Sequence, residues 1–407
     1  MVLATKKRLK ILAVLPWPDN PTMDGFAQRS HMIVDALNKL GDLRVLITTG
    51  RNSDSEAAVD NMRQRIRQVD FFPVSFATLR LENKGVIQNS SELLAVMLAR
   101  PRGFLARDFL NQRKQKSQLE EETYDVVFYR SVPEYLHLSR LICARYSIVD
   151  FDERHSQILK VENFTTQKQL QSKLFTYLER KVATRVDAIS IVKKEDAEDL
   201  TSQNVYELRN MPFNRAGNDQ AITEPASPTV AFVGNFTHSP PNVDCARRIL
   251  QRIFPRIRAF VPDCKVILAG TGSDAVIPPL HSSLPGVDIK GEVENISDVY
   301  AAVSLIIYPV AFNPGSSVIL PEAVCHHLPV LASRQAIKGQ PQELVDRGAV
   351  VVADNDDEFV SNAIQILNDR EKQNQMKKAA ARCASEFYPE SYFETRLSEI
   401  ISGLTNR

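Results

Sequence analysis

The chain has 407 residues, of which 43% are hydrophobic and 24% charged, and its formal net charge is +1. This length exceeds one ordinary domain and fits two, and the composition excludes a disordered, fibrous or disulfide-rich protein. A net charge close to zero gives no overall field to attract nucleic acid, so no nucleic-acid partner is expected.

In the first half, short apolar runs alternate with amphipathic stretches of helical length, the pattern of βαβ units in a parallel sheet. The run Leu9–Leu15 is predicted to be a strand and not a signal peptide, because prolines follow it and a small-residue cleavage site does not. The clearest predicted helices are Phe26–Leu40 and Gln167–Thr184. The predicted strands are Lys10–Leu15, Arg44–Thr48, Asp125–Tyr129, Ser147–Phe151 and Asp187–Val192.

A segment rich in Pro, Asn, Asp and Ser, residues 210–229, has no hydrophobic period and is predicted to be a linker. Six apolar runs after it predict a second parallel sheet, with a helix over Asn242–Phe260 that places Ile249, Ile253, Ile257 and Phe260 on one face. In such sheets ligands bind at the carboxyl ends of the strands, where the strand order reverses. The cleft between two such domains is therefore the expected active site.

Four segments of the second half resemble, in order, the nucleotide-sugar domain of the GT4 family of retaining glycosyltransferases. They are VAFVGNFTHSPPNVDCARRILQRIFPRIR (230–258), CKVILAGTGSD (264–274), LPGVDIKGEVENISDVYAAVSLIIYPV (284–310) and NPGSSVILPEAVCHHLPVLAS (313–333). The Pro-Asn-Val-Asp start of the first helix is similar to one branch of the family. Weaker matches in the first half are the loop Pro16–Arg29, DFDERHS (150–156) and the run 177–210.

The resemblance implies the GT-B fold, in which two Rossmann-like, doubly wound α/β domains face a cleft. It implies an acceptor-side domain over 1–210, a linker over 211–228, a nucleotide-sugar domain over 229–390, and a last helix over 391–407 that returns to the first domain. The implied donor is a nucleotide sugar, UDP- or GDP-linked, and the implied acceptor is a saccharide or lipid-linked molecule. Enzymes of this fold usually hold no metal or other cofactor, and no metal-ligand spacing is present in the sequence.

Glu322 is the first candidate for donor binding. The resemblance gives it the ribose hydroxyls, which suits a carboxylate because it only accepts hydrogen bonds; an ordinary first-turn Glu stabilised by the helix dipole is the alternative. Backbone N–H groups and hydroxyls at the start of the same helix would hold the diphosphate, although a plain helix cap would look the same. These and the other donor-side candidates are Gly315, Ser316, Ser317, Gly234, Asn235, Phe236 and Gly270, the last in a GxG turn that tight turning alone also explains.

The cations that many family members place against the diphosphate are missing here. The aligned positions are Asn235, the turn 239–242, Ser317 and Ile319, and Pro314 replaces the first Glu of the family's E-x7-E pair. Because electrostatic stabilisation of the leaving group is usually the largest catalytic contribution, another cation is expected. Arg334 and Lys338, which follow the strand PVLAS, are the first candidates, with His238 on a neighbouring loop.

In the first domain, a predicted strand ends in Asp150, Asp152, Glu153 and His155. Family members place acidic residues or His here, so Asp152 and His155 are the catalytic candidates that orient the acceptor hydroxyl; a solvated strand end is the alternative. Retaining enzymes of this fold have no agreed protein nucleophile, and none is assigned. The loop Pro16–Arg29 lines the acceptor side in relatives, which makes acceptor-binding candidates of Asp24, Gly25, Gln28 and Arg29.

The basic runs Met62–Arg67 and Ala99–Lys116 fit either a solvated helix face or peripheral contact with an anionic membrane. The five cysteines are scattered without a CxxC pair, which predicts buried, reduced thiols and a cytoplasmic protein, or one on the inner face of the membrane. Two other functions stay open: a catalytically silent GT-B subunit that binds a partner or a glycan, and a sugar-nucleotide epimerase of the same fold. A nicotinamide dehydrogenase is disfavoured, because GxGxxG does not follow Leu9–Leu15.

Overall fold

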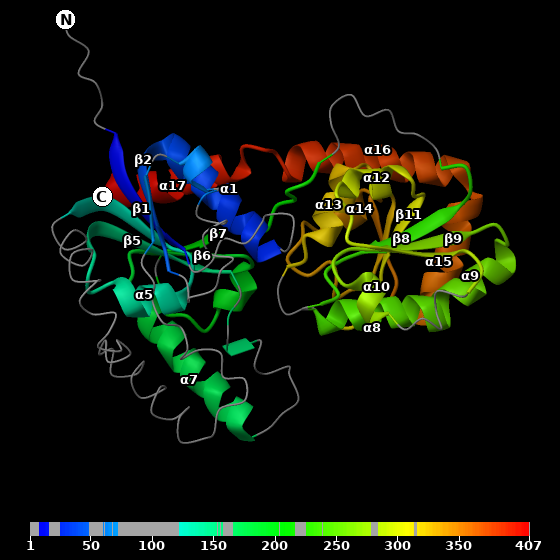
Figure 1. Cartoon of the computed structure of the whole chain (residues 1–407), viewed down its shortest axis with the longest axis horizontal. Coiled ribbons are helices and arrows are strands. Elements are labelled where there is room, and N and C mark those ends of the chain that lie inside the picture. Colours follow the sequence, from blue (N-terminus) through cyan, green and yellow to red (C-terminus); the bar gives the residue numbers. More distant parts are fainter. Residues whose placement is uncertain are drawn as a thin grey trace, which may run out of the picture. The chain divides into compact units, whose positions relative to one another are not determined.

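The structure is a computed structural model of the whole chain (Figure 1). It describes residues 8–15, 25–48, 60, 62–66, 68–71, 122–152, 154, 156–157, 166–202, 204–215, 225–237, 239–277, 284–312 and 316–406. Contacts divide the described chain into two units: unit 1 comprises β1, residues from Phe26 to Leu208 and residues from Phe393 onward, and unit 2 comprises Gly25 and the residues from Arg209 to Tyr392.

Unit 1 is built on a seven-stranded parallel sheet in the order β3-β2-β1-β4-β5-β6-β7. The predicted strands and both predicted helices of this half are confirmed, while the short strands β3 and β7 were not predicted because each is too brief to show a period. The strands are β1 (Leu9–Leu15), β2 (Gly41–Ile47), β3 (Gln68–Phe71), β4 (Thr123–Tyr129), β5 (Cys143–Phe151), β6 (Ala188–Ile191) and β7 (Val205–Glu207). The helices are α1 (Gly25–Leu40), α5 (Val132–Leu138), α7 (Thr166–Ala183), the 3-10 turn η2 (Lys194–Ala197) and α17 (Tyr392–Thr405).

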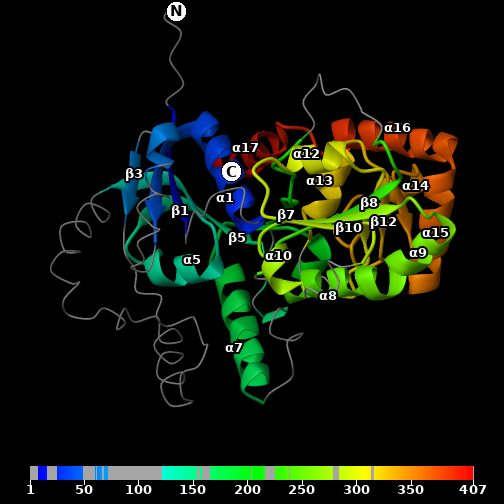
Figure 2. The same cartoon turned by 45° about the vertical axis from the view of Figure 1, so that its right-hand side comes forward.

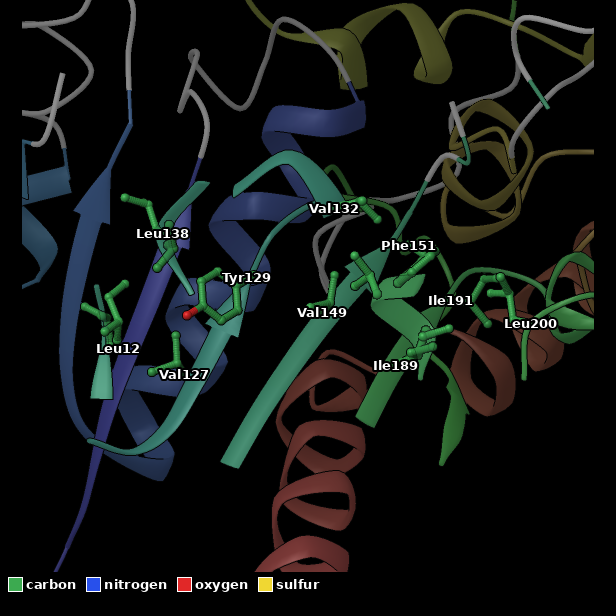
Figure 3. Packing of buried hydrophobic residues seen from close by; sticks show 14 of the residues in the cluster. Leu12, Val127, Tyr129, Val132, Leu138, Val149, Phe151, Ile189, Ile191 and Leu200 are labelled. Carbon is green, nitrogen blue, oxygen red and sulfur yellow. The ribbon is translucent and has the colours of Figure 1, made fainter. Parts of the chain in front are cut away.

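The core of unit 1 forms where the apolar central strands face their covering helices. Figure 3 shows side chains of β1, β4, β5 and β6, such as Leu12, Val127, Val149 and Ile189, gathered with Leu138 of α5, and each is almost fully buried. Strands buried on both faces read as continuous apolar runs, which is why these strands were visible in the sequence. One exception is Cys143, which is exposed because it begins β5 beyond the covered part of the sheet; the prediction that all five thiols are buried was wrong.

Unit 2 is built on a six-stranded parallel sheet in the order β10-β9-β8-β11-β12-β13. All six predicted strands are present, and with unit 1 they confirm the predicted pair of doubly wound α/β domains. The strands are β8 (Thr229–Val233), β9 (Lys265–Ala269), β10 (Val287–Gly291), β11 (Leu305–Tyr308), β12 (Val330–Ala332) and β13 (Val350–Val352). The helices are α8 (Pro240–Arg248), the π-helical turn η3 (Ile249–Ile253), α9 (Phe254–Phe260), α10 (Ser273–Val276), α12 (Ile296–Ala301), α13 (Ile319–Cys325), α14 (Glu343–Asp346), α15 (Asp356–Asn368) and α16 (Arg370–Phe387).

Helices cover both faces of this sheet. In both views α8 and α9 lie on one face and α13 and α16 on the other (Figures 1 and 2). The predicted helix 242–260 is continuous but contains the π-helical turn η3 just before Pro255, whose ring and missing N–H disturb the regular bonding to the preceding turn. Phe260, predicted on the buried face, is 71% exposed because α9 ends there and Val261 is buried instead.

The chain passes from one unit to the other at the peptide bonds Leu208–Arg209 and Tyr392–Phe393, as it also does near the start of α1. Within unit 2 the two flanking residues meet: the backbone N–H of Arg209 donates to the Tyr392 hydroxyl at 3.1 Å. Within unit 1, Arg29 donates to the Leu208 carbonyl at 2.7 Å and its guanidinium lies 5.6 Å from the centre of the Phe393 ring. Helix α17, which follows, belongs to unit 1, where Arg396 donates to the Glu207 carbonyl of β7 at 3.2 Å.

Candidate active site

In unit 2 the strand order reverses between β8 and β11, so the loops after these strands flank the expected ligand position. The turn at Ser316 and Ser317 that opens α13 is fixed by hydrogen bonds within the unit. Gln340 donates to the Ser316 hydroxyl at 2.7 Å and to the Ser317 carbonyl at 3.1 Å, and Asn210 donates to the Ser316 carbonyl at 2.9 Å. The side chain of Gln340 in turn accepts from the Tyr388 hydroxyl at 2.7 Å. Gly315, the third residue of the predicted diphosphate turn, lies outside the described residues.

Glu322 lies in α13 directly after this turn and is 5% exposed. One carboxylate oxygen accepts from the Tyr300 hydroxyl at 3.2 Å and the other faces the Asn214 amide at 3.5 Å. Burial, together with the Glu322 carboxylate, raises the pKa of the Tyr300 hydroxyl, so this group remains a donor. Each carboxylate oxygen has two lone pairs and can accept more than one hydrogen bond.

His326, at the end of α13, packs against the same tyrosine. Its ring centre lies 4.5 Å from that of Tyr300. Burial lowers the pKa of His326 to about 4, with a smaller contribution from His327, so the ring is neutral at physiological pH. Among the described residues none forms a hydrogen bond with its buried Nε2 atom. His327 adopts a left-handed conformation with φ of 56°, which is uncommon for a residue other than glycine.

The predicted donor residues that follow β8 and β9 are of two kinds: some serve the packing of the unit, and others are exposed to solvent. A Cβ on Gly270, which has φ of +126°, would lie 2.0 Å from the Gly234 carbonyl oxygen, so the close approach of the two loops requires glycine at 270. A Cβ on Gly234 would instead meet the Asn242 side chain, 2.8 Å from its Nδ2 atom. Phe236 is buried and its ring meets Phe232 edge-on at 5.7 Å, which turns the side chain toward the core and away from a ligand. Asn235 is partly exposed, and its carbonyl accepts from the Asn242 side chain at 2.9 Å.

The candidate cations of unit 2 lie on the exposed loop after β12. Arg334 pairs with Asp354 at 2.8 Å, both side chains being largely exposed, and its hydrogen bond lowers the pKa of the Asp354 carboxyl. Lys338 is exposed two residues before Gln340. His238 lies outside the described residues. An exposed pair of this kind is weak, so Arg334 is free to exchange Asp354 for another anion at little cost.

In unit 1 a cluster of charged side chains occupies the carboxyl edge of the sheet. Asp150, at the end of β5, is fully buried and accepts two hydrogen bonds from Arg29 of α1, at 2.9 and 2.7 Å. Arg130, which follows β4, donates to Asp150 at 2.9 Å and to Asp152 at 2.7 Å. Arg29 was predicted to bind the acceptor, but it is fully buried as a structural partner of Asp150. A side chain buried in this ion network does not contact a ligand.

The remaining acceptor-side candidates differ in their placement. Gln28 is 5% exposed, and among the described residues none donates to its Oε1 atom, an unusual state for a buried acceptor. Gly25 begins α1. Asp24 and His155 lie outside the described residues.

The sequence did not reveal three residues that hold predicted site residues in place. They are Arg130, Asn242 and Gln340, which hold Asp152, the Asn235 loop and the Ser316 turn, respectively. Arg130 carried a usable signal, because a charged residue directly after a buried parallel strand lies at the edge where ligands bind. Asn242 and Gln340 gave none, since single amides on helical or loop segments are common.

The described residues can also be considered for a metal site and for a membrane-spanning helix. None of their clusters of His, Cys, Asp and Glu has three or more members placed to hold a metal ion. None of the described helices has the length and apolar character needed to cross a membrane. A hollow of about 570 Å³ in unit 1 is lined by residues such as Tyr146, Asp187 and Asn204, at the edge of the sheet where β5 and β6 begin, opposite to the carboxyl edge.

Residues 227–369 match the family described as glycosyl transferases group 1. The two parallel-sheet domains and this matched segment define the class: the chain is a glycosyltransferase of the GT-B fold. None of the curated protein sequences compared with the chain matches it significantly.

Solved structures with this fold cover nearly the whole chain. Sucrose-phosphate synthase from Thermosynechococcus elongatus is similar with a TM-score of 0.66 at 14% identity, over 98% of this chain and 99% of the other. HepE from Anabaena, solved with UDP and glucose, has a TM-score of 0.62 at 14% identity, over 97% and 99%. WaaG, a glycosyltransferase involved in lipopolysaccharide biosynthesis, has a TM-score of 0.58 at 12% identity, over 96% and 100%.

Proposed function

We propose that the protein transfers a sugar, with retention of configuration, from a nucleoside diphosphate sugar to a saccharide or lipid-linked acceptor in the assembly of cell-surface polysaccharide or other glycans. The observation that carries the proposal is the position of Glu322 inside the matched segment: it is a buried carboxylate beside the strand-order reversal of unit 2, where it accepts from the Tyr300 hydroxyl. The Pro-Asn-Val-Asp start of α8 supports membership in the corresponding GT4 branch.

In this proposal unit 2 binds the nucleotide. Glu322 accepts from the ribose hydroxyls, and the Ser316 and Ser317 hydroxyls and Asn235 lie on the loops that would receive the diphosphate. A uridine nucleotide is the first to test, since HepE was solved with UDP-glucose and TarM from S. aureus with UDP. A GDP-sugar is the second. The reaction is proposed to need no bound metal, with the positive charge supplied by side chains such as Arg334 or Lys338.

Unit 1 binds the acceptor in this proposal. Asp152, which accepts from Arg130 at 2.7 Å, is proposed to orient the acceptor hydroxyl, and Gln28 at the start of α1 is proposed to contact the acceptor. Because the five cysteines are free thiols, the proposed compartment is the reducing cytoplasm, including the inner face of the membrane, where lipid-linked acceptors are found.

The test is nucleotide affinity in two variants of Glu322. Glu322→Gln keeps an oxygen for the Tyr300 hydroxyl but removes the charge, and it should weaken UDP or GDP binding by about 1.5–3 kcal/mol in calorimetry. Glu322→Ala should add a loss of fold stability of about 1–3 kcal/mol, because it leaves the buried Tyr300 hydroxyl unsatisfied. Unchanged affinity in a folded Glu322→Gln protein would refute the ribose assignment.

One observation favours the silent-subunit alternative: the positions at which many family members carry the diphosphate-binding cations hold Asn235, Ser317 and Ile319 here. A panel of UDP-, GDP-, ADP-, dTDP- and CMP-sugars decides between them. A transferase transfers or slowly hydrolyses at least one donor, and Arg334→Ala or Lys338→Ala lowers that turnover more than about tenfold, equal to about 1.4 kcal/mol of transition-state stabilisation. A silent subunit consumes none of the donors.

A further inference from the structure

In unit 2, the loop that follows β12 is linked at both of its ends to the loop that follows β11. The two strands are parallel neighbours, so their loops leave the sheet at the same edge. At the start of the second loop, Ser333 donates from its backbone N–H to the Tyr308 carbonyl at 3.0 Å and from its hydroxyl to the Val310 carbonyl at 2.6 Å. At the end of that loop, the side chain of Gln340 makes the other link. The two links enclose residues 334–339, which include both candidate cations of this loop.

The amide of Gln340 is held in one orientation by its partners. Its nitrogen donates to the Ser316 hydroxyl at 2.7 Å and to the Ser317 carbonyl at 3.1 Å. A carbonyl oxygen only accepts, so the nitrogen of the amide faces Ser317 and its oxygen faces away. That oxygen accepts from the Tyr388 hydroxyl at 2.7 Å. Tyr388 is fully buried, and burial raises the pKa of its hydroxyl, so the hydroxyl stays protonated and remains a donor.

Gln340 therefore ties the loop of candidate cations to a turn that is itself well ordered. The Ser316 carbonyl of this turn accepts from Asn210 at 2.9 Å, and the Ser317 hydroxyl accepts from the Ile319 backbone N–H at 3.1 Å. A site whose parts are fixed in advance binds its ligand with a smaller loss of conformational entropy than a site whose loops become ordered on binding. The link made by Gln340 thus favours binding by groups from both loops at once.

We propose that Gln340 is a positioning residue for the donor diphosphate, which holds the turn at Ser316 and Ser317 together with the loop that carries the candidate cations. The inference deepens the proposed function and rests on it. Both ends of the Gln340 amide are engaged within the protein, so Gln340 acts through the turn and the loop. Glu322, proposed to bind the ribose, has its own partner in Tyr300. Loss of Gln340 should therefore weaken binding of a nucleoside diphosphate and leave binding of the nucleoside unchanged.

The experiment compares Gln340→Met with a matched control, Gln373→Met, in the full chain. Gln373 is also a partly buried glutamine of unit 2 with an amide nitrogen that donates to two acceptors, the Ile366 carbonyl at 2.9 Å and the Leu367 carbonyl at 3.2 Å. The ligands are the best bound of UDP, GDP, ADP and dTDP, measured by calorimetry, and the matching nucleoside, measured by NMR titration. Gln340→Met should lower the ratio of the diphosphate affinity to the nucleoside affinity by about fivefold or more, with the nucleoside affinity within about twofold of wild type. Gln373→Met should leave the ratio within about twofold, because its hydrogen bonds are of the same kind but join α15 to α16.

Tyr388→Phe tests the orientation of the amide without removing Gln340. It deletes the hydroxyl that holds the amide oxygen, so the same ratio should fall by about twofold or more. The double variant of Tyr388→Phe and Gln340→Met should have the same ratio as Gln340→Met alone, because both changes act on one contact.

The outcomes separate this role from the proposed function. An equal fall in the diphosphate and nucleoside affinities of Gln340→Met, an unchanged ratio, or a Gln373→Met variant that loses as much overturns the inference and leaves the proposed function intact. Wild-type protein that binds the diphosphate no more tightly than the nucleoside does the same. Wild-type protein that binds none of the four diphosphates overturns the proposed function and the role of Gln340 together. If Gln340→Met does not fold, Tyr388→Phe decides, and an unchanged ratio in that variant overturns the inference.

Discussion

His326 should make unit 2 sensitive to acid. Its pKa of about 4 in the folded protein lies below the 6.5 of an exposed histidine, so the unfolded chain takes up the proton first as the pH falls. The stability that depends on a neutral His326 is fully present above pH 6.5 and is lost as the pH falls toward 4. The full difference corresponds to about 3 kcal/mol, and the partial exposure of the ring reduces the loss expected at pH 4.5 to about 2 kcal/mol.

The assay is urea unfolding at pH 7.5 and pH 4.5, with His326→Phe as the comparison. Phenylalanine keeps a ring against Tyr300 and cannot be protonated, and it also removes the buried Nε2 atom. At pH 7.5 the two proteins should differ by less than about 1 kcal/mol, and at pH 4.5 the variant should be the more stable by about 2 kcal/mol. Other groups titrate equally in both proteins, so a stability difference that is the same at both pH values would refute the reasoning.

Three further predictions concern stability and need only thermal or urea unfolding. Glu179→Ala leaves the buried charge of Arg154 without its main partner and should destabilise unit 1 by about 3–5 kcal/mol, whereas a loss under 1 kcal/mol would show that the pair is solvated. His327→Gly relieves the left-handed backbone and should raise stability by up to about 1 kcal/mol; a decrease would mean that the imidazole contributes more than the strain costs. Gly270→Ala forces a Cβ against the Gly234 carbonyl in a conformation closed to alanine, so it should cost about 3 kcal/mol or more, and a neutral result would contradict the loop packing.

Much of the architecture was predictable from the sequence, because buried parallel strands are apolar along their whole length. The six strands of unit 2 and the main strands of unit 1 each carry four or more consecutive apolar residues or end in a turn signal, and the amphipathic helices between them show their own period. Strand β7 was missed, since Val205–Glu207 has three residues and pairs at the edge of the sheet. Phe260 was misplaced, because periodicity does not reveal at which residue a helix ends.

The sequence predicted where the site residues lie better than it predicted what each side chain contacts. Sequence predicted the acidic cluster at the end of β5, but only the fold shows that Arg29 and Ser190 donate to Asp150 while Arg130 donates to Asp152. The same limit applies to Phe236, whose place after a strand suggested ligand contact and whose ring is in the core. The hydrogen-bond partners of these arginines lie between 20 and 179 positions away in the chain. A single sequence does not reveal such distant pairings.

Because α17 belongs to unit 1, the order in which the ribosome makes this chain differs from the order in which its units can be completed. Unit 1 begins with β1, yet part of its core, including Leu397, Ile400 and Leu404, is supplied by α17, which is synthesised after every residue of unit 2. Of the described residues, unit 2 comprises Gly25 and the stretch from Arg209 to Tyr392, so all of it has been synthesised before Phe393. During translation the nascent unit 1 therefore lacks the apolar side chains that α17 adds to its core until unit 2 has been made.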